Sequence, residues 1–157
     1  MGIFLADDTA TENLGRTLAA ACPSQCLIFL RGDLGTGKTT LSRGFLRGLG
    51  YTGRVKSPTY TLLEPYEIDA GDQSPVHQIY HFDLYRLSDP EELTYLGAED
   101  CFAADAVSLV EWPQQGEGML PSADLEIRLE YRNDGRCARL QAGTDRGHQI
   151  MKQLSLE

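Results

Sequence analysis

The chain has 157 residues, of which 41% are hydrophobic and 24% charged, and its formal net charge is −9. A chain of this length buries about 70% of its unfolded surface, so we expect residues 1–157 to form a single domain with its own core. The acidic balance disfavours free-standing nucleic-acid binding, which depends on Lys and Arg neutralising phosphates.

The early part of the chain predicts a helix, a strand, a glycine-rich loop and a second helix. Thr9 and Glu12 form a capping box that begins a helix over 9–21. The continuous apolar run 26–30 is typical of a strand that is buried on both faces. The loop 32–37 then leads into a helix over 39–49, which Gly50 ends.

The later part alternates between strands and helices before it ends in a hairpin. Asp89 caps a helix that Gly97 ends, and Asn133, Asp134 and Gly135 join two alternating segments into a hairpin. The tail from Thr144 is weakly helical at best. The expected extended segments are Val55, 60–63, 76–83, 106–110, 125–131 and 137–142. This order predicts an α/β domain with a mostly parallel central sheet and an antiparallel hairpin at one edge.

Two features bear on the surroundings of the protein. The longest apolar run has five residues, whereas a membrane-spanning helix needs about 20, and the first residues have neither the basic nor the apolar region of a leader. We therefore expect a cytoplasmic protein without membrane association. The four cysteines lack ligand spacing, which favours buried thiols over zinc binding or a disulfide framework.

Residues 32–39, GDLGTGKT, match the phosphate-binding loop G-x-x-x-x-G-K-[ST]. In such a loop the backbone N–H groups form an anion cradle, and the following helix adds the positive end of its dipole. Lys38 would reach the β- and γ-phosphates, and the Thr39 hydroxyl would bind Mg²⁺. A chance match is the alternative, but the strand before and the helix after favour a P-loop NTPase-like, three-layer domain. The residues expected to bind the nucleotide here are Asp33, Leu34, Gly35, Thr36, Gly37, Lys38, Thr39 and Thr40.

Two acids stand where apolar runs stop. Asp83 follows the run 79–82, and Glu111 follows 106–110. A P-loop enzyme needs a carboxylate near its metal at the carboxyl end of a neighbouring strand, so we expect both acids to act with Lys38 in catalysis and with Thr39 at the metal. The sequence leaves open which acid contacts the metal directly, and a strand-end cap is the alternative for each.

Other polar residues lie near these acids in the chain. Thr59, in Ser57-Pro58-Thr59, stands where switch hydroxyls meet a γ-phosphate, although an ordinary Ser-Pro turn fits equally well. His81 shares a strand face with Asp83 and either orients that acid or is a core histidine. Trp112 is either a core residue or a neighbour of the nucleotide.

Positive charge is concentrated in the segment from Arg31 to Lys56, which contains six basic residues and only one acidic residue. Arg43 and Arg47 are four residues apart, so they share one face of the predicted helix. The segment is either a docking surface for an acidic partner, or for RNA held by a partner, or a plain solvated helix face.

Four stretches, taken in order, resemble the TsaE (YjeE) family, the small ATPase of bacterial threonylcarbamoyladenosine tRNA modification. They are 32–40 (GDLGTGKTT), 57–62 (SPTYTL), 81–87 (HFDLYRL) and 110–113 (VEWP). The resemblance implies a cytoplasmic ATPase that uses ATP and Mg²⁺ and supports the TsaB–TsaD transferase, with tRNA reached only through that complex.

By matching position, the resemblance makes Asp83 the Walker-B-like acid, Glu111 a metal-side acid and Thr59 a switch-like threonine. It also implies that the segment from Asp8 to Thr11 contacts the base. Two departures are visible: Thr36 replaces a common alanine, and the loop 70–75 is longer than in many relatives.

Two other functions remain open. A small-molecule P-loop kinase would need an arginine-bearing lid, and none is obvious, although Arg128, Arg132, Arg136 and Arg139 lie in the late hairpin. A non-hydrolytic, nucleotide-gated binding module would need no strand-end acids, so Asp83 and Glu111 argue mildly against it.

Overall fold

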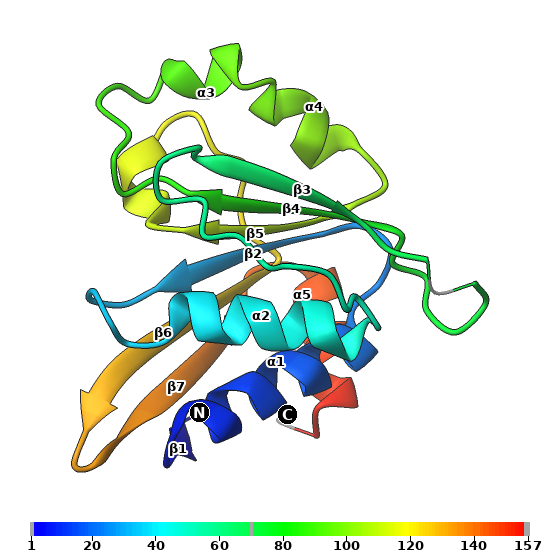
Figure 1. Ribbon diagram of the computed structural model, residues 1–157, viewed down its shortest axis with the longest axis vertical. Helices are drawn as coiled ribbons and strands as arrows, with labels where there is room; N and C mark the ends of the chain where they lie inside the picture. The colour runs from blue at the N-terminus through cyan, green and yellow to red at the C-terminus, as the bar shows by residue number, and fades with distance from the viewer. Residues whose placement is uncertain (1, 70, 156–157) are drawn as a thin grey trace.

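A seven-stranded sheet runs through the computed structural model, which describes residues 2–69 and 71–155 (Figure 1). The strands are β1 (Gly2–Leu5), β2 (Cys26–Arg31), β3 (Leu63–Glu67), β4 (Gln78–Asp83), β5 (Val107–Glu111), β6 (Leu125–Arg132) and β7 (Gly135–Ala142). Their order across the sheet is β1-β7-β6-β2-β5-β4-β3. The central strands β6, β2, β5 and β4 are parallel, and the β6–β7 hairpin is antiparallel, which confirms the predicted fold class. The opposite edge is antiparallel too, because β3 runs against β4.

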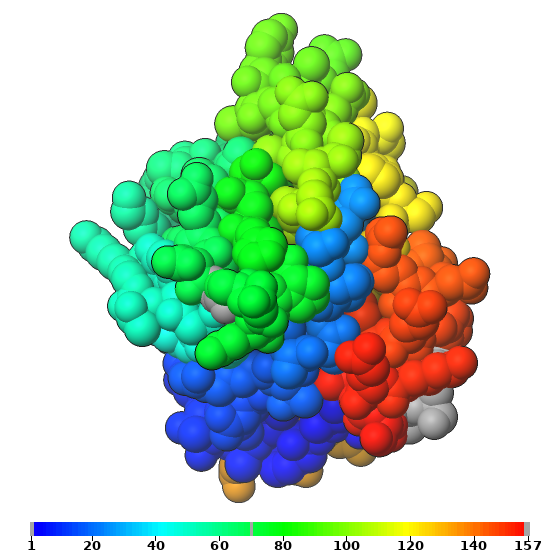
Figure 2. All heavy atoms as spheres, turned by 90° about the vertical axis from the view of Figure 1, so that its right-hand side faces the viewer, coloured from blue at the N-terminus to red at the C-terminus, as the bar shows by residue number. Residues whose placement is uncertain are grey.

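Helices cover both faces of the sheet. On the first face lie α1 (Asp8–Ala21), α2 (Lys38–Gly48) and α5 (Asp145–Gln153); on the second lie α3 (Glu92–Tyr95), α4 (Ala98–Ala103) and the 3-10 helix η1 (Pro113–Gly116). Strand β2 serves both layers, since Ile28 and Leu30 face the first core while Leu27 and Phe29 face the second. Figure 2 shows α5 (red) beside α1 (blue), with α3 and α4 (yellow-green) at the top of the molecule.

The second layer covers fewer strands of the sheet than the first. Its apolar cluster draws on β2, β4 and β5, and it contains no described residue of β6 or β7. On β6 the first face is buried, as Ile127 and Leu129 show, whereas Arg128 and Glu130 on the second face are exposed. Among the described residues, no helix covers the second face of the sheet over β6 and β7, and this part of the face is called the bare area below.

Helices α1 and α2 pack so closely that a side chain would not fit between them at Gly44. A Cβ atom there would collide with the main-chain carbonyl oxygen of Glu12. This close approach sets the start of α1 beside the start of α2, where the site described below lies.

Several predicted boundaries are wrong. Helix α1 begins at Asp8, because Asp7 rather than Thr9 caps it: the Asp7 carboxylate accepts a hydrogen bond of 2.9 Å from the Ala10 N–H. Val55 and residues 60–62 are not in a strand. Residues 58–62 form a turn that the Leu62 N–H closes on the Pro58 carbonyl at 2.7 Å, so β3 begins only at Leu63.

The ends of the chain also differ from the prediction. The tail forms a regular helix, α5, because the Thr144 hydroxyl accepts a hydrogen bond from the Gly147 N–H and donates one to Asp124. Strand β1 and helix α4 were not predicted, although Gly97 does end the preceding helix with a left-handed backbone. Among the described helices, none combines the length and the apolar character needed to cross a bilayer.

Candidate functional site

A cavity of about 350 Å³ lies at the carboxyl ends of β2, β4 and β5. Glu111 is in register with Leu30 on one side and with Asp83 on the other, so the three strand ends meet at one edge. The residues that line the cavity are Asp8, Leu34, Gly35, Gly37, Lys38, Thr39, Thr40, Thr59, Asp83, Glu111, Trp112 and Arg136.

The glycine-rich loop joins β2 to α2 and presents the start of that helix to the cavity. Gly37 precedes the helix with a φ of 106°, a left-handed conformation that glycine adopts without strain. No side chain of the described residues caps α2, so the amides of residues 38–40 have no helical partner. These amides and the helix dipole make the loop an anion site.

Lys38 is buried inside the loop. Its ammonium donates hydrogen bonds to the carbonyls of Gly32 and Asp33, the latter at 2.9 Å, and lies 4.5 Å from the centre of the Trp112 ring. Burial lowers the pKa of Lys38, and the neighbouring carboxylates of Glu111 and Asp83 oppose that shift. The cation is therefore held at the floor of the site with little freedom to move.

Glu111 connects the loop to β4. The Thr39 hydroxyl lies 3.1 and 3.2 Å from the two Glu111 carboxylate oxygens, and His81 Nε2 lies 2.6 Å from Glu111 Oε2. His81 is fully buried, and its Nδ1 has no partner within residues 2–69 and 71–155. Of the two alternatives for His81, the core position is the one observed, and the pairing with Asp83 is not, because its hydrogen bond goes to the acid on the neighbouring strand.

Asp83 has a separate set of partners. Its Oδ1 accepts from the Tyr85 N–H at 3.0 Å, and its Oδ2 accepts from the Thr59 hydroxyl at 3.3 Å. Ser57 in turn contacts Thr59, oxygen to oxygen, at 2.7 Å. Burial raises the pKa of Asp83 above its ordinary value, Glu111 adds to the increase, and the Tyr85 N–H opposes it.

At the opposite end of the cavity stands Arg136, which the sequence places only among the late-hairpin arginines of the kinase alternative and not among the expected nucleotide-binding residues. Arg136, on β7, donates hydrogen bonds to Asp8 at 2.9 Å and to the Thr11 hydroxyl at 3.4 Å. A Cβ atom at Gly37 would collide with its guanidinium group, so Arg136 lies directly against the loop. No spacing signal could have found it, since it enters the site through the pairing of β1 with β7, in which Leu5 faces Arg136.

Three of the residues expected to bind the nucleotide do not line the cavity. Thr11 and Thr36 are buried and bond to the carbonyls of Asp7 and Asp33, so they brace the surrounding backbone. The Asp33 side chain is exposed, and its carbonyl receives Lys38. Trp112 lines the cavity with a left-handed backbone, φ 56°, and stacks at a tilt on Tyr85, 4.9 Å away.

The donor set fits a magnesium–nucleotide complex better than a metal alone. The described residues contain no group of three or more His, Cys, Asp or Glu side chains able to hold a metal by themselves. Mg²⁺ takes oxygen ligands and is usually held by one or two carboxylates together with phosphates and water. The Thr39 hydroxyl and the carboxylates of Glu111 and Asp83 supply such oxygens at the edge of the phosphate loop.

A buried parallel strand, a G-x-x-x-x-G-K-T loop and a helix, facing acids at neighbouring strand ends, define a P-loop protein. A family model described as "Threonylcarbamoyl adenosine biosynthesis protein TsaE" matches residues 5–139. The chain belongs to the TsaE family.

Individual relatives agree with this assignment. A Haemophilus influenzae protein named "tRNA threonylcarbamoyladenosine biosynthesis protein TsaE" is 50% identical over 129 residues, which cover 82% of this chain and 78% of the relative. A Bacillus subtilis protein of the same name is 37% identical, over 79% of this chain and 73% of its own. The crystal structure of Bacillus subtilis YdiB superposes with a TM-score of 0.82 at 30% identity, covering 99% of this chain and 93% of that one.

Proposed function

We propose that this chain is a single-domain cytoplasmic ATPase that uses Mg²⁺ and supports the TsaB–TsaD transferase. That transferase places a threonylcarbamoyl group on the tRNA adenosine next to the anticodon. Membership of the TsaE family, whose name refers to threonylcarbamoyladenosine biosynthesis, supports the pathway. The observation that carries the ATPase proposal is the meeting of Lys38 and Thr39 with Glu111 and Asp83 in one cavity.

The phosphates would lie over the start of α2. The free amides of residues 38–40 would donate to phosphate oxygens, and the Lys38 ammonium stands beside them on the loop carbonyls. Because Lys38 is buried and fixed, little reorganisation is needed when negative charge develops on the transferred phosphoryl group.

Thr39 and Glu111 would hold the Mg²⁺ ion, with Asp83 beside its coordination shell, and the ion would neutralise phosphate charge. Thr39 already contacts Glu111, which makes Glu111 the acid on the metal side of the loop. Asp83 is bonded instead to Thr59, so we assign it the orientation of the attacking water, with Thr59 as the switch-like hydroxyl. The contact with His81 would hold the Glu111 carboxylate in place.

The nucleoside would extend toward the start of α1. Asp8 and Arg136 form that end of the cavity, and Asp8 is largely exposed while Arg136 is mostly covered. Because the Asp8 carboxylate is exposed, it can leave Arg136 when a nucleotide enters, which frees guanidinium donors for the nucleotide.

The test is ATP hydrolysis by the purified chain, alone and with TsaB, TsaD and tRNA. Lys38→Ala should remove most ATP binding or turnover, because the buried cation beside the phosphates is lost. The matched control is Lys152→Ala, at an exposed lysine on α5. Turnover that rises with the partners and falls at least about 100-fold in Lys38→Ala would support the proposal.

The opposite results separate the alternatives. Wild-type binding and turnover in Lys38→Ala would contradict the site. Turnover that is indifferent to the partners would favour the small-molecule kinase, and a metabolite that receives the phosphate would establish it. Nucleotide-dependent binding of the partners without any turnover would favour the gated module.

A further inference from the structure

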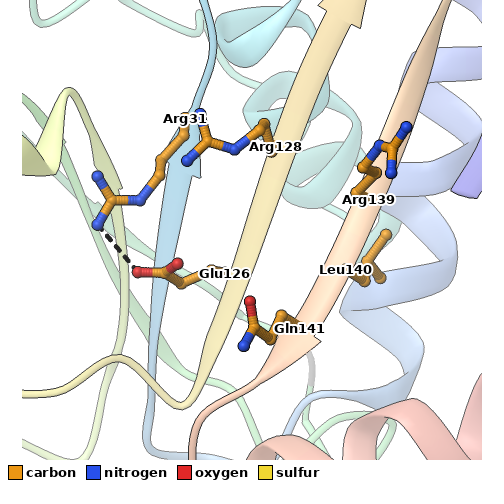
Figure 3. Close-up of a pocket in the computed structure, with 6 residues that line it drawn as sticks. All are labelled: Arg31, Glu126, Arg128, Arg139, Leu140 and Gln141. Atoms are coloured by element: carbon orange, nitrogen blue, oxygen red, sulfur yellow. Dashed lines mark hydrogen bonds and ion pairs between the residues drawn. The ribbon is translucent and has the colours of Figure 1, made fainter. Parts of the chain in front are cut away.

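Of the four arginines in the described β6–β7 hairpin, only Arg136 lines the nucleotide cavity. It lies on β7 in step with Ala138 and Leu140, which enter the first core, so strand alternation directs its side chain toward α1 and α2. Arg128 and Arg139 line a separate hollow on the second face of the sheet (Figure 3). The position of Arg136 along β7 therefore sets it apart from its neighbours in the hairpin.

The end of the hairpin contacts the phosphate loop at two points. Tyr131 on β6 and Arg136 on β7 are direct neighbours in the strand register. The Tyr131 hydroxyl donates to the Leu34 carbonyl at 3.3 Å, and the Arg136 guanidinium lies against Gly37. Arg136 thus stands beside the backbone that leads into α2, where free amides would receive phosphates.

The Arg136 guanidinium is covered, but its ion-pair partner is not. The side-chain exposure is 16% for Arg136 and 75% for Asp8. Both hydrogen bonds of Arg136, to Asp8 at 2.9 Å and to the Thr11 hydroxyl at 3.4 Å, start from Nη1. A guanidinium has five N–H donors in a rigid fork, so these two bonds leave donors for a ligand. Because an exposed carboxylate is readily solvated by water, separation of the pair costs little free energy.

The formal charges that line the cavity show which carboxylate opposes an anionic ligand. Two cations, Lys38 and Arg136, stand against three carboxylates, those of Asp8, Asp83 and Glu111, so the net charge is −1. A phosphate chain is repelled by this excess until one carboxylate turns away. Asp83 and Glu111 are only 5% and 3% exposed and hold hydrogen bonds, so Asp8 is the carboxylate that can move into water.

The place of Arg136 in the cavity identifies the phosphate that it would meet. Thr39 contacts Glu111 at the end where the β- and γ-phosphates and Mg²⁺ are expected. Arg136 lies on the Thr11 side of Gly37, beside the start of α1, where the nucleoside would extend. Only the α-phosphate lies between the nucleoside and the β-phosphate. Arginine forks pair closely with phosphate oxygens, which suits Arg136 to that position.

We propose that Arg136 is a ligand of the α-phosphate of the nucleotide, and that Asp8 competes with this phosphate for the guanidinium. The inference rests on the proposed function, which makes ATP the ligand of the cavity. Because the pair must separate before the phosphate is bound, Asp8 lowers the affinity for every nucleotide that carries an α-phosphate.

The first experiment measures the affinities of ATP, ADP and GTP for the full chain by calorimetry, with Mg²⁺ present. Arg136→Gln should bind ATP and ADP on the order of 10-fold more weakly, by the same factor for both, because both carry the α-phosphate. The ratio of ATP affinity to GTP affinity should keep its wild-type value, since a phosphate contact does not read the base. Arg54→Gln, the same change at an exposed arginine after α2, should stay within about twofold of wild type.

Removal of the competing carboxylate should have the opposite effect. Asp8→Asn should bind ATP about two- to fivefold more tightly than the wild type. Asp72→Asn, at an exposed aspartate, is the control and should bind like the wild type. In the Arg136→Gln background the gain from Asp8→Asn should disappear, because no guanidinium remains for the carboxylate to occupy.

Each contrary result overturns a different part. If the wild type does not bind ATP, the proposed function fails and the inference fails with it. If the wild type binds ATP and a folded Arg136→Gln, judged by its unfolding midpoint without nucleotide, binds it equally well, only the role of Arg136 fails. A changed ratio of ATP to GTP affinity would make Arg136 a contact of the base instead.

The Asp8 variant tests the competition independently. Weaker ATP binding by Asp8→Asn would make that carboxylate a nucleotide ligand rather than a competitor, and an equal gain in both backgrounds would mean that it does not act through Arg136. If Arg136→Gln does not fold, Asp8→Asn decides alone, and wild-type affinity in that variant would overturn the inference.

Discussion

The cavity at the strand ends and an arginine row across β2, β6 and β7 (Arg31, Arg128 and Arg139, neighbours in the strand register) both gather charges from strands that are distant in the sequence, yet the two regions differ in burial. His81, Glu111 and Asp83 are 0%, 3% and 5% exposed, whereas Arg139 is exposed by 58% of its side chain. In the cavity each carboxylate has hydrogen-bond partners: Thr39 and His81 contact Glu111, and Thr59 contacts Asp83. In the row Arg128 is tied to nothing that the structure describes.

The difference shows how burial decides what a charge can do. Inside the cavity, desolvation shifts the pKa of Asp83 upward and that of Lys38 downward, and the network holds both in one geometry. On the bare face, water screens the same kinds of charge, so an ion pair contributes little to stability. The buried cluster suits chemistry that needs fixed groups, whereas the exposed row has no such fixed network.

The largest expected effect within this comparison is that of Glu111→Gln. An amide cannot accept from both Thr39 and His81 with the strength of a carboxylate, and it is a poorer magnesium ligand. We expect ATP turnover to fall by about 100-fold or more, measured in a single-turnover assay. Glu117→Gln, at an exposed glutamate after η1, is the control. Equal turnover in the two variants would remove Glu111 from the site.

A smaller effect is expected from Asp83→Asn, and its sign depends on pH. Since burial raises the pKa of Asp83 in the folded chain, the unfolded chain gives up this proton first as the pH rises. Its stabilising contribution is present below about pH 3.9, the ordinary pKa of aspartate, and is lost as the pH rises through the raised pKa. Asparagine at this position does not titrate, so the stability of the Asp83→Asn variant does not decrease in this way as the pH rises.

The measurement is the thermal unfolding midpoint of both proteins between pH 4 and 7, without nucleotide or metal. The unfolding midpoint of Asp83→Asn should increase relative to that of the wild type as the pH rises. ATP turnover of the variant should fall by at least about 10-fold. A constant difference between the two midpoints across this range would mean that Asp83 titrates as an ordinary exposed carboxyl group.

The smallest effect belongs to the exposed region. Arg31→Ala, Glu126→Ala and the double variant form a cycle around the 2.9 Å pair at the edge of the row. Both partners are partly exposed, so we expect a coupling energy of about 0.2–1 kcal/mol in chemical denaturation, reduced further by salt. A coupling of several kcal/mol would show that the bare face is structurally constrained like the cavity, and the contrast between the regions would disappear.

The sequence by itself determined the features that depend on near neighbours. The spacing of Gly32, Gly37 and Lys38 specifies the loop, the apolar run before it specifies β2, and Asn133 to Gly135 specify the hairpin turn. The strand-end positions of Asp83 and Glu111 follow from the same local pattern, because polar residues mark where buried strands stop. Each of these features depends on turn residues and apolar runs that lie within a few residues of one another.

Only the tertiary structure decided which distant residues meet. Strand β1 is four residues long and becomes a strand by pairing with β7. That pairing brings Arg136 to the loop, and the register of β2, β6 and β7 aligns the arginine row. The partner of His81 was decided in the same way, by the alignment of β4 with β5. Strand pairing is set by packing across the whole sheet, and no spacing along the chain encodes it.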